Sequence, residues 1–139
     1  TIIKFDPTHI YYFATPFIFS GSKGRFSNDI YNNFMEFYVH KYKDLVDYLC
    51  ANGKKRLFFY PSSVAIDEIQ HDMMEYTLAK MNGESLNIIL EELYKDLKIY
   101  TPRLPRMATD QTVSLLAVNN EDPLIILPLL RQFQKLENE

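Results

Sequence analysis

Tyr76 and Lys80 are the two residues whose types and spacing are best suited to acid–base chemistry. They stand four positions apart, and residues four apart on a helix share a face, so the ammonium can approach the phenol. A cation at ~4 Å, in surroundings with an effective dielectric constant of ~20, would lower the pKa of a tyrosine from about 10 by roughly three units. We therefore predict that Tyr76 can exchange a proton near neutral pH; the competing interpretation is an ordinary exposed pair on a helix.

The serine pair Ser62 and Ser63 supplies a hydroxyl group that could complete such a site. The serines follow a short apolar run at 57–60, which predicts a buried strand, and Pro61 stands between the run and the serines. A hydroxyl at the end of that strand can hold the oxygen of a carbonyl or an alkoxide opposite the phenol of Tyr76.

The elements that must position these side chains alternate along the chain. Dense apolar runs and helical periodicity predict strands at 9–14, 57–60 and 97–101 and long helices at 28–49 and 72–95. This order favours an α/β fold, in which a parallel sheet with right-handed crossovers carries helices on both faces.

Ligands in such sheets bind beyond the carboxyl ends of the strands, which here are 14–16, 61–63 and 101–106. A last helix is expected from Asp122, with a bend or interruption at Pro128.

Each long helix carries an apolar stripe. The first is closed by Gly53, a natural left-handed cap. In the second, one side holds Met74, Leu78, Met81, Ile88 and Ile89, and Tyr76, Lys80, Gly83 and Asn87 lie near the other. We interpret these stripes as core faces, with a protein interface as the alternative.

The stretches "FFYPSSVAIDE" and "EYTLAKMNGESL" resemble the short-chain dehydrogenase/reductase family, whose members place a serine after one strand and Tyr-x-x-x-Lys on the next helix. The resemblance covers about residues 9–112. Ser63, thirteen residues before Tyr76, matches the family's serine. The resemblance implies that Tyr76 is the general acid/base, that Ser63 positions the reacting oxygen, and that Lys80 lowers the pKa of the tyrosine and holds the nicotinamide ribose.

The resemblance also implies NAD or NADP as cofactor and a small carbonyl or alcohol as substrate. By the resemblance, the loop after the third strand lies over the nicotinamide and the substrate, with Thr109 contacting the carboxamide. From their residue type, Arg103 and Arg106 in this loop are predicted to bind a phosphate or carboxylate of the substrate, with ordinary surface arginines as the alternative. The implied assembly is a homodimer formed through the two long helices.

Three features depart from the family. No G-x-G-x-x-G occurs, and "SGSKGR" is interpreted as a flexible loop; "FATP" stands where the family often has Asn-Ala-Gly. The family's helix asparagine has no clear match, with Tyr38 or His40 in its neighbourhood.

The expected fold is a three-layer Rossmann-like parallel sheet with flanking helices, truncated to a catalytic half that forms a single domain over 1–139, with the amino-terminal nucleotide-binding βαβ part absent. A noncatalytic Rossmann-like dimerisation or protein-interaction module is the alternative.

Composition limits the partners. The chain has 139 residues, 47% of them hydrophobic, and a formal net charge of −3, which suggests neither nucleic-acid nor membrane binding. The single cysteine, Cys50, is expected to be a half-buried thiol and fits a reducing compartment, so we predict a cytoplasmic protein. His9, His40 and His71 lack ligand spacing, so no metal site is predicted. Asp67 and Glu68 are a candidate carboxylate pair, or simply solvated acids leading a helix.

Overall fold

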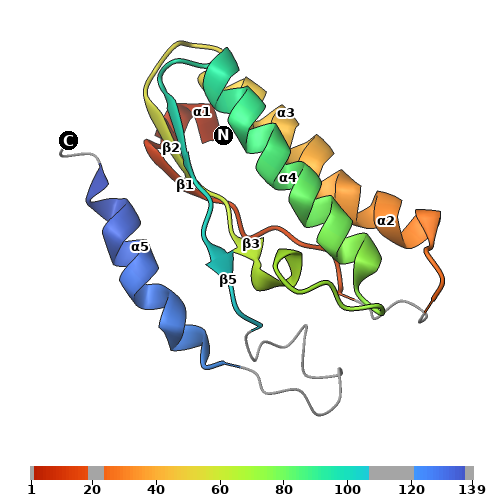
Figure 1. Ribbon diagram of the computed structural model, residues 1–139. Helices are drawn as coiled ribbons and strands as arrows, with labels where there is room; N and C mark the ends of the chain where they lie inside the picture. The colour runs from red at the N-terminus through yellow and green to blue at the C-terminus, as the bar shows by residue number, and fades with distance from the viewer. Residues whose placement is uncertain (1, 19–23, 107–120, 137–139) are drawn as a thin grey trace.

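Three short parallel strands form the centre of the fold (Figure 1). In the computed structural model, which describes residues 2–18, 24–106 and 121–136, β1 (His9–Tyr11), β2 (Arg56–Phe59) and β4 (Leu97–Tyr100) pair in the order β1-β2-β4. All four residues of β2 are buried, as expected for a central strand covered on both faces. The predicted α/β fold with a parallel sheet is confirmed. A short helix, α1 (Ile2–Phe5), precedes β1.

The strands continue beyond the predicted ends. After Pro61 the chain pairs again as β3 (Ser62–Ser63), and after Pro102 as β5 (Arg103–Leu104), in parallel register with Ser63 opposite Leu104. The expected loop at Ser62 and Ser63 is therefore a strand. The prolines only interrupt the ladder, because the amide of Ser62 still donates to the carbonyl of Pro102 at 2.8 Å.

One face of the sheet is covered by two long helical segments. The first runs through α2 (Asn28–Met35), the π-helical turn η1 (Glu36–His40) and α3 (Lys41–Cys50). Its predicted cap is confirmed, since Gly53 has a φ of 67°. The second is α4 (Met74–Leu93), which follows the short 3₁₀ turn η2 (Val64–Ile66).

The π turn η1 faces the sheet and receives two tyrosine hydroxyls. The hydroxyl of Tyr12 donates to the carbonyl of Phe37 at 2.6 Å, and that of Tyr60 donates to the carbonyl of Tyr38 at 3.0 Å. A π turn displaces carbonyls from the regular helical ladder, and such turns are frequent near functional sites. These bonds tie the first long helix to the ends of β1 and β2.

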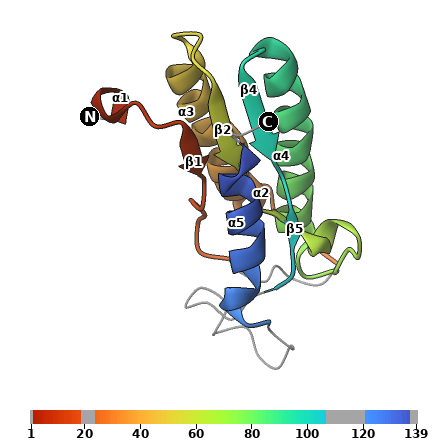
Figure 2. The same cartoon turned by 90° about the vertical axis from the view of Figure 1, so that its left-hand side faces the viewer.

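Within the described residues, one helical segment covers the opposite face, which gives the fold three layers (Figures 1 and 2). This segment consists of the 3₁₀ turn η3 (Pro123–Ile126) and α5 (Leu127–Gln134). The predicted interruption is confirmed, because the helix type changes at Leu127, next to Pro128. Phe133 is fully buried against Leu57 and Phe59 of β2.

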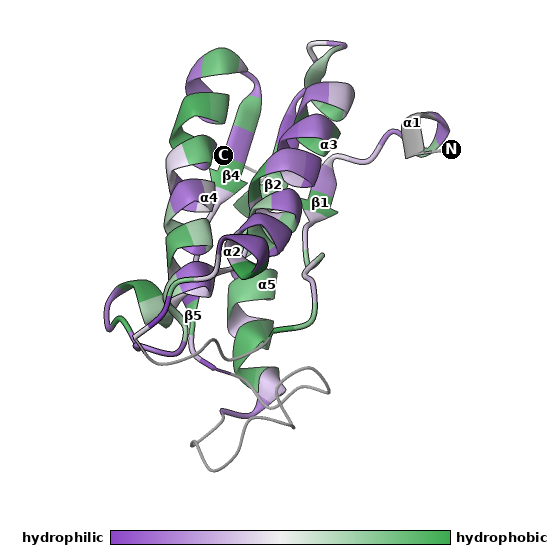
Figure 3. Ribbon diagram, turned by 90° about the vertical axis from the view of Figure 1, so that its right-hand side faces the viewer, coloured by the Kyte–Doolittle hydropathy of each residue, from purple (hydrophilic) through white to green (hydrophobic). Residues whose placement is uncertain are grey.

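The apolar stripe of α4 does not form the core. Leu78, Ile88 and Ile89 are 39%, 66% and 62% exposed, and Figure 3 shows hydrophobic colour along α4 beside the mostly hydrophilic α2. The interpretation of this stripe as a core face was wrong. The buried residues of α4 are mostly small or polar: Glu75, Thr77, Ala79, Lys80, Gly83, Asn87 and Leu90.

Candidate active site

A cavity of about 680 Å³ lies beyond the carboxyl ends of the strands. It is lined by residues 12–15, 60–65 and 104–106, together with side chains near the start of α4. This is the predicted place for a ligand in an open parallel sheet, and the volume is in the range of small-molecule sites.

Tyr76 and Ser63 meet at the wall of this cavity. Both residues line it. Burial raises the pKa of the Tyr76 phenol above its ordinary value, and the Ser63 side chain opposes this rise. The Ser63 hydroxyl also accepts a bond from the amide of Ala65 at 3.2 Å, which fixes it at the entrance to η2.

Lys80 is buried one helical turn from Tyr76. Its ammonium donates to the carbonyl of Pro61 at 2.8 Å and lies 3.8 Å from the ring centroid of Tyr38, whereas the ring centroid of Tyr76 is 5.8 Å away. Burial lowers the pKa of Lys80 to about 7, and the nearby Glu84 carboxylate opposes this shift.

Lys80 is not among the groups that shift the pKa of Tyr76 in this structure, so its predicted effect on that pKa stays a prediction. Instead of falling, the pKa of Tyr76 is raised, because burial disfavours the phenolate and Ser63 is the group that opposes it. The ammonium interacts chiefly with a carbonyl and another ring, and its own burial disfavours its charge. The three side chains are nevertheless brought to one wall, as the sequence predicted.

Tyr38 occupies the space beside Lys80 from the side of the first long helix. It is 2% exposed, and its hydroxyl forms a hydrogen bond of 2.5 Å with the hydroxyl of Thr15. Burial raises the pKa of Tyr38 as well, so this phenol stays neutral. His40, the other candidate for this neighbourhood, is exposed.

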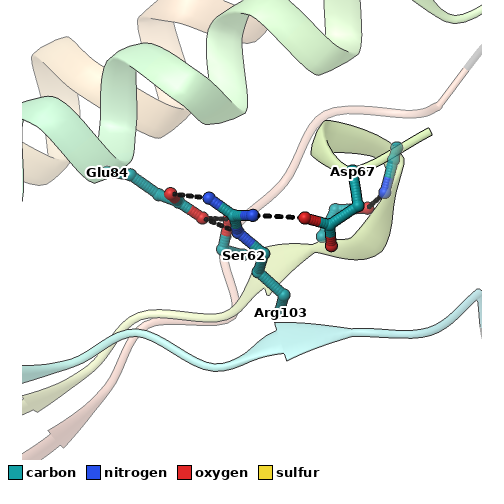
Figure 4. A network of polar contacts seen from close by, with 6 residues as sticks. Ser62, Asp67, Glu84 and Arg103 are labelled. Atoms are coloured by element: carbon teal, nitrogen blue, oxygen red, sulfur yellow. Dashed lines mark hydrogen bonds and ion pairs between the residues drawn. The ribbon is translucent and has the colours of Figure 1, made fainter. Parts of the chain in front are cut away.

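Arg103 does not line the cavity but lies in a network with two carboxylates (Figure 4). Its guanidinium binds both oxygens of Glu84, with Nε to Oε1 at 2.9 Å and Nη2 to Oε2 at 2.8 Å, and Nη1 pairs with Asp67. The hydroxyl of Ser62 donates to the same Glu84 carboxylate. The arginine holds the pKa of Glu84 below its usual range, so the acid stays ionised.

This network links α4, β3, β5 and η2, and it explains the candidate pair Asp67 and Glu68. Asp67 pairs with Arg103, while Glu68 is exposed at the cavity rim. Sequence reasoning missed Glu84. The available signal was its position one helical turn after Lys80, on the side of the helix that faces the sheet.

Arg106 does line the cavity, as predicted for a substrate contact. Its Nη2 atom is buried and has no hydrogen-bond partner within the described part of the chain. Thr109, the predicted carboxamide contact, lies outside the described residues.

Within residues 2–18, 24–106 and 121–136, no three His, Cys, Asp or Glu side chains gather as metal ligands would. Cys50 is more deeply buried than expected, at 6% exposure, and burial raises its pKa, which disfavours the reactive thiolate. None of the described helices is both long and apolar enough to span a bilayer.

Comparisons with protein-family models and with curated protein sequences find no match to this chain. Solved structures do match it. A short-chain dehydrogenase from Salmonella enterica subsp. enterica serovar Typhi str. CT18 superposes with a TM-score of 0.77 at 14% identity, over 94% of this chain and 58% of that one. This chain has a dehydrogenase-like Rossmann fold. A 4-hydroxyisoleucine dehydrogenase complexed with NADH superposes on that Rossmann fold with a TM-score of 0.74 at 11% identity, over 99% of this chain and 65% of that one. The chain thus spans less than two thirds of either structure.

Proposed function

We propose that this chain carries the catalytic site of an NAD(P)-dependent oxidoreductase of the short-chain dehydrogenase type, which interconverts a carbonyl and an alcohol. The observation that carries the proposal is that Ser63, Tyr76 and Lys80 all line the cavity beyond the strand ends, with Lys80 one helical turn from Tyr76. The fold of the similar structures supports it.

In the direction of carbonyl reduction, Tyr76 acts as the general acid. Because burial raises the pKa of its phenol, the proton is present at neutral pH and can pass to the oxygen of the product alkoxide. Ser63 holds that oxygen by donating a hydrogen bond, which stabilises the developing negative charge. In the oxidative direction the same phenolate accepts the proton of the alcohol.

The role of Lys80 is to supply positive charge when negative charge develops on the Tyr76 phenol. Burial lowers its pKa to about 7, so its protonation state can change near neutral pH and it can take up a proton as the phenolate forms. A charged ammonium at this site would stabilise phenolate on Tyr76. Its bond to Pro61 already places it at the cavity wall.

The residues present fit the nicotinamide end of a dinucleotide. Lys80 lines the cavity and would hold a ribose hydroxyl; NAD and NADP remain alternatives. When bound, the cofactor would supply hydride transfer. The chain contains no G-x-G-x-x-G turn for the pyrophosphate, so we expect the chain alone to bind the whole dinucleotide weakly. One of the similar structures holds NADH.

The proposal is tested by turnover of a panel of carbonyl compounds and alcohols with NADH, NADPH and their oxidised forms. The Tyr76→Phe variant should lose activity by about 10²–10⁴-fold, the usual contribution of a general acid or base. Tyr48→Phe is the matched control, because Tyr48 is an exposed tyrosine on α3. Equal turnover by wild type and Tyr76→Phe would overturn the catalytic assignment.

The exposed apolar stripe of α4 supports a second proposal, that the chain forms a homodimer through its long helices. Leu78, Ile88, Ile89 and Leu93 are all at least 39% exposed on this one helix. A stripe of this kind is typical of an interface when it does not face the core. The same stripe would serve the alternative function, a noncatalytic dimerisation or interaction module.

A further inference from the structure

Arg103 and Arg106, the two arginines that follow β4, have different surroundings, although the same role was predicted for both from the sequence. Arg103 makes hydrogen bonds to both Glu84 oxygens and to Asp67, which occupies all three of its guanidinium nitrogens. All of its guanidinium nitrogens are therefore used in contacts within the protein. Arg106, two positions beyond Leu104, instead lines the large cavity.

Arg106 carries an unused donor at that cavity. Its Nη2 atom is buried without a hydrogen-bond partner among the described residues. A buried guanidinium donor without an acceptor is unfavourable. An oxygen anion from a ligand in the cavity would satisfy this donor, and planar guanidinium groups bind carboxylates and phosphates well.

The other charged residues that line the cavity do not compete for this role. Lys80 already donates to the carbonyl of Pro61 and lies over the ring of Tyr38. Asp67 is paired with Arg103, and Glu68 is exposed at the rim. Within the described part of the chain, Arg106 is thus the lining cation with a buried nitrogen left to bind a ligand.

We propose that Arg106 binds an anionic group, a carboxylate or a phosphate, of the ligand that fills the cavity, and that the substrate is a carbonyl compound bearing such a group. This rests on the proposed function, in which Ser63 and Tyr76 hold the reacting oxygen. Ser63 pairs with Leu104, and the two residues from Leu104 to Arg106 span at most about 7 Å of backbone. The acidic group therefore lies several bonds away from the reacting carbonyl.

The same anion chemistry has a second source, the phosphates of the nicotinamide cofactor. Two pairs of probes separate the sources. 5-Oxohexanoate and its neutral amide, 5-oxohexanamide, test the substrate acid. NADH and reduced nicotinamide riboside, which lacks phosphate, test the cofactor. Binding to the full chain is measured by calorimetry and by ligand-observed NMR, neither of which requires turnover.

Wild type should bind the charged member of at least one pair about tenfold more tightly than the neutral member, as one charge-assisted bond provides. Arg106→Gln should remove that preference, and Arg106→Lys should retain part of it. Arg131→Gln is the matched control, because Arg131 is exposed on α5, on the opposite face of the sheet. Circular dichroism and thermal unfolding establish that each variant is folded.

The outcomes are distinct. Loss of the preference for 5-oxohexanoate assigns the anion to the substrate, and loss of the preference for NADH assigns it to the cofactor phosphate, which would overturn the substrate class. Equal binding of charged and neutral probes by wild type, or an unchanged preference in Arg106→Gln, overturns the anion site altogether. Failure of the proposed function is seen separately, as unchanged turnover in Tyr76→Phe.

Discussion

Gly83 lies where α4 packs against Tyr60, the residue that follows β2. Replacing Gly83 with alanine should displace Tyr60, which lines the cavity, and destabilise the fold. A Cβ atom at this position would lie 2.7 Å from Cζ of Tyr60 and closer still to the hydroxyl oxygen. Tyr60 cannot easily move, because it is 1% exposed and its ring is 4.6 Å from that of Tyr42. Its hydroxyl also donates to the carbonyl of Tyr38.

Two unfavourable effects and one favourable effect set the magnitude. Forcing a methyl group into a packed interior costs about 1–3 kcal/mol. Displacing the Tyr60 hydroxyl leaves buried polar groups unpaired, which costs about 1–3 kcal/mol more. Alanine is better than glycine in a helix by about 1 kcal/mol. The free energy of unfolding of Gly83→Ala should therefore fall by about 3 kcal/mol.

Urea unfolding measures this change. Ser85→Ala, an exposed position on the same helix, is the control and should change the free energy of unfolding by no more than about 0.5 kcal/mol. Tyr60→Phe removes the atom that clashes most, so the double variant Gly83→Ala/Tyr60→Phe should be more stable than the sum of the single changes predicts. A Gly83→Ala protein as stable as wild type, or strict additivity in the double variant, would refute the reasoning.

Three further predictions concern charge and surface. Burial lowers the pKa of Lys80 from 10.5 to about 7, so between these pH values the unfolded chain binds more protons than the folded chain. The stability of the wild type should therefore rise with pH in this range. Urea unfolding from about pH 7 to about pH 9.5 measures this rise, which should be smaller in Lys80→Met. The lowered pKa of Glu84 stabilises the fold at pH values above the unfolded-state pKa, and this contribution is lost as pH falls through the folded-state pKa. Between about pH 6 and about pH 3 the wild type should therefore lose more stability than Glu84→Gln. Equal slopes of stability against pH in the two proteins would contradict this prediction. Ile88→Glu, at a 66% exposed position, should convert a dimer to a monomer in light scattering without lowering the thermal midpoint, and an unchanged mass would exclude α4 from the interface.

Features that depend on local patterns were predictable from the sequence. Apolar runs and helical periodicity gave the order of strands and helices, and Pro128 marked the change of helix type near the carboxyl terminus. The placement of a serine and Tyr76 at one cavity was also predictable, because a strand end and the start of the next helix lie at the same edge of a parallel sheet, whereas the choice of Ser63 over Ser62 came from the family resemblance.

Features that depend on tertiary partners were not predictable. The buried face of α4 includes Glu75 and Lys80, and each of them is satisfied by a distant backbone group, the amide of Ser27 or the carbonyl of Pro61. Hydropathy therefore assigned the wrong face to the core. The pKa of Lys80 depends on burial, and the role of Arg103 depends on two carboxylates from other segments, so neither is encoded in a local pattern.

Transfer of isotope from a reduced nicotinamide cofactor, deuterated at its hydride-donating carbon, is the most direct measurement of the proposed chemistry. The wild-type chain should deliver deuterium to the carbinol carbon of the alcohol product, detected by mass spectrometry, and Tyr76→Phe should do so about 10²–10⁴-fold more slowly. Alcohol formed without the label, or labelled at the same rate by Tyr76→Phe, would contradict hydride transfer at a site where Tyr76 supplies the proton.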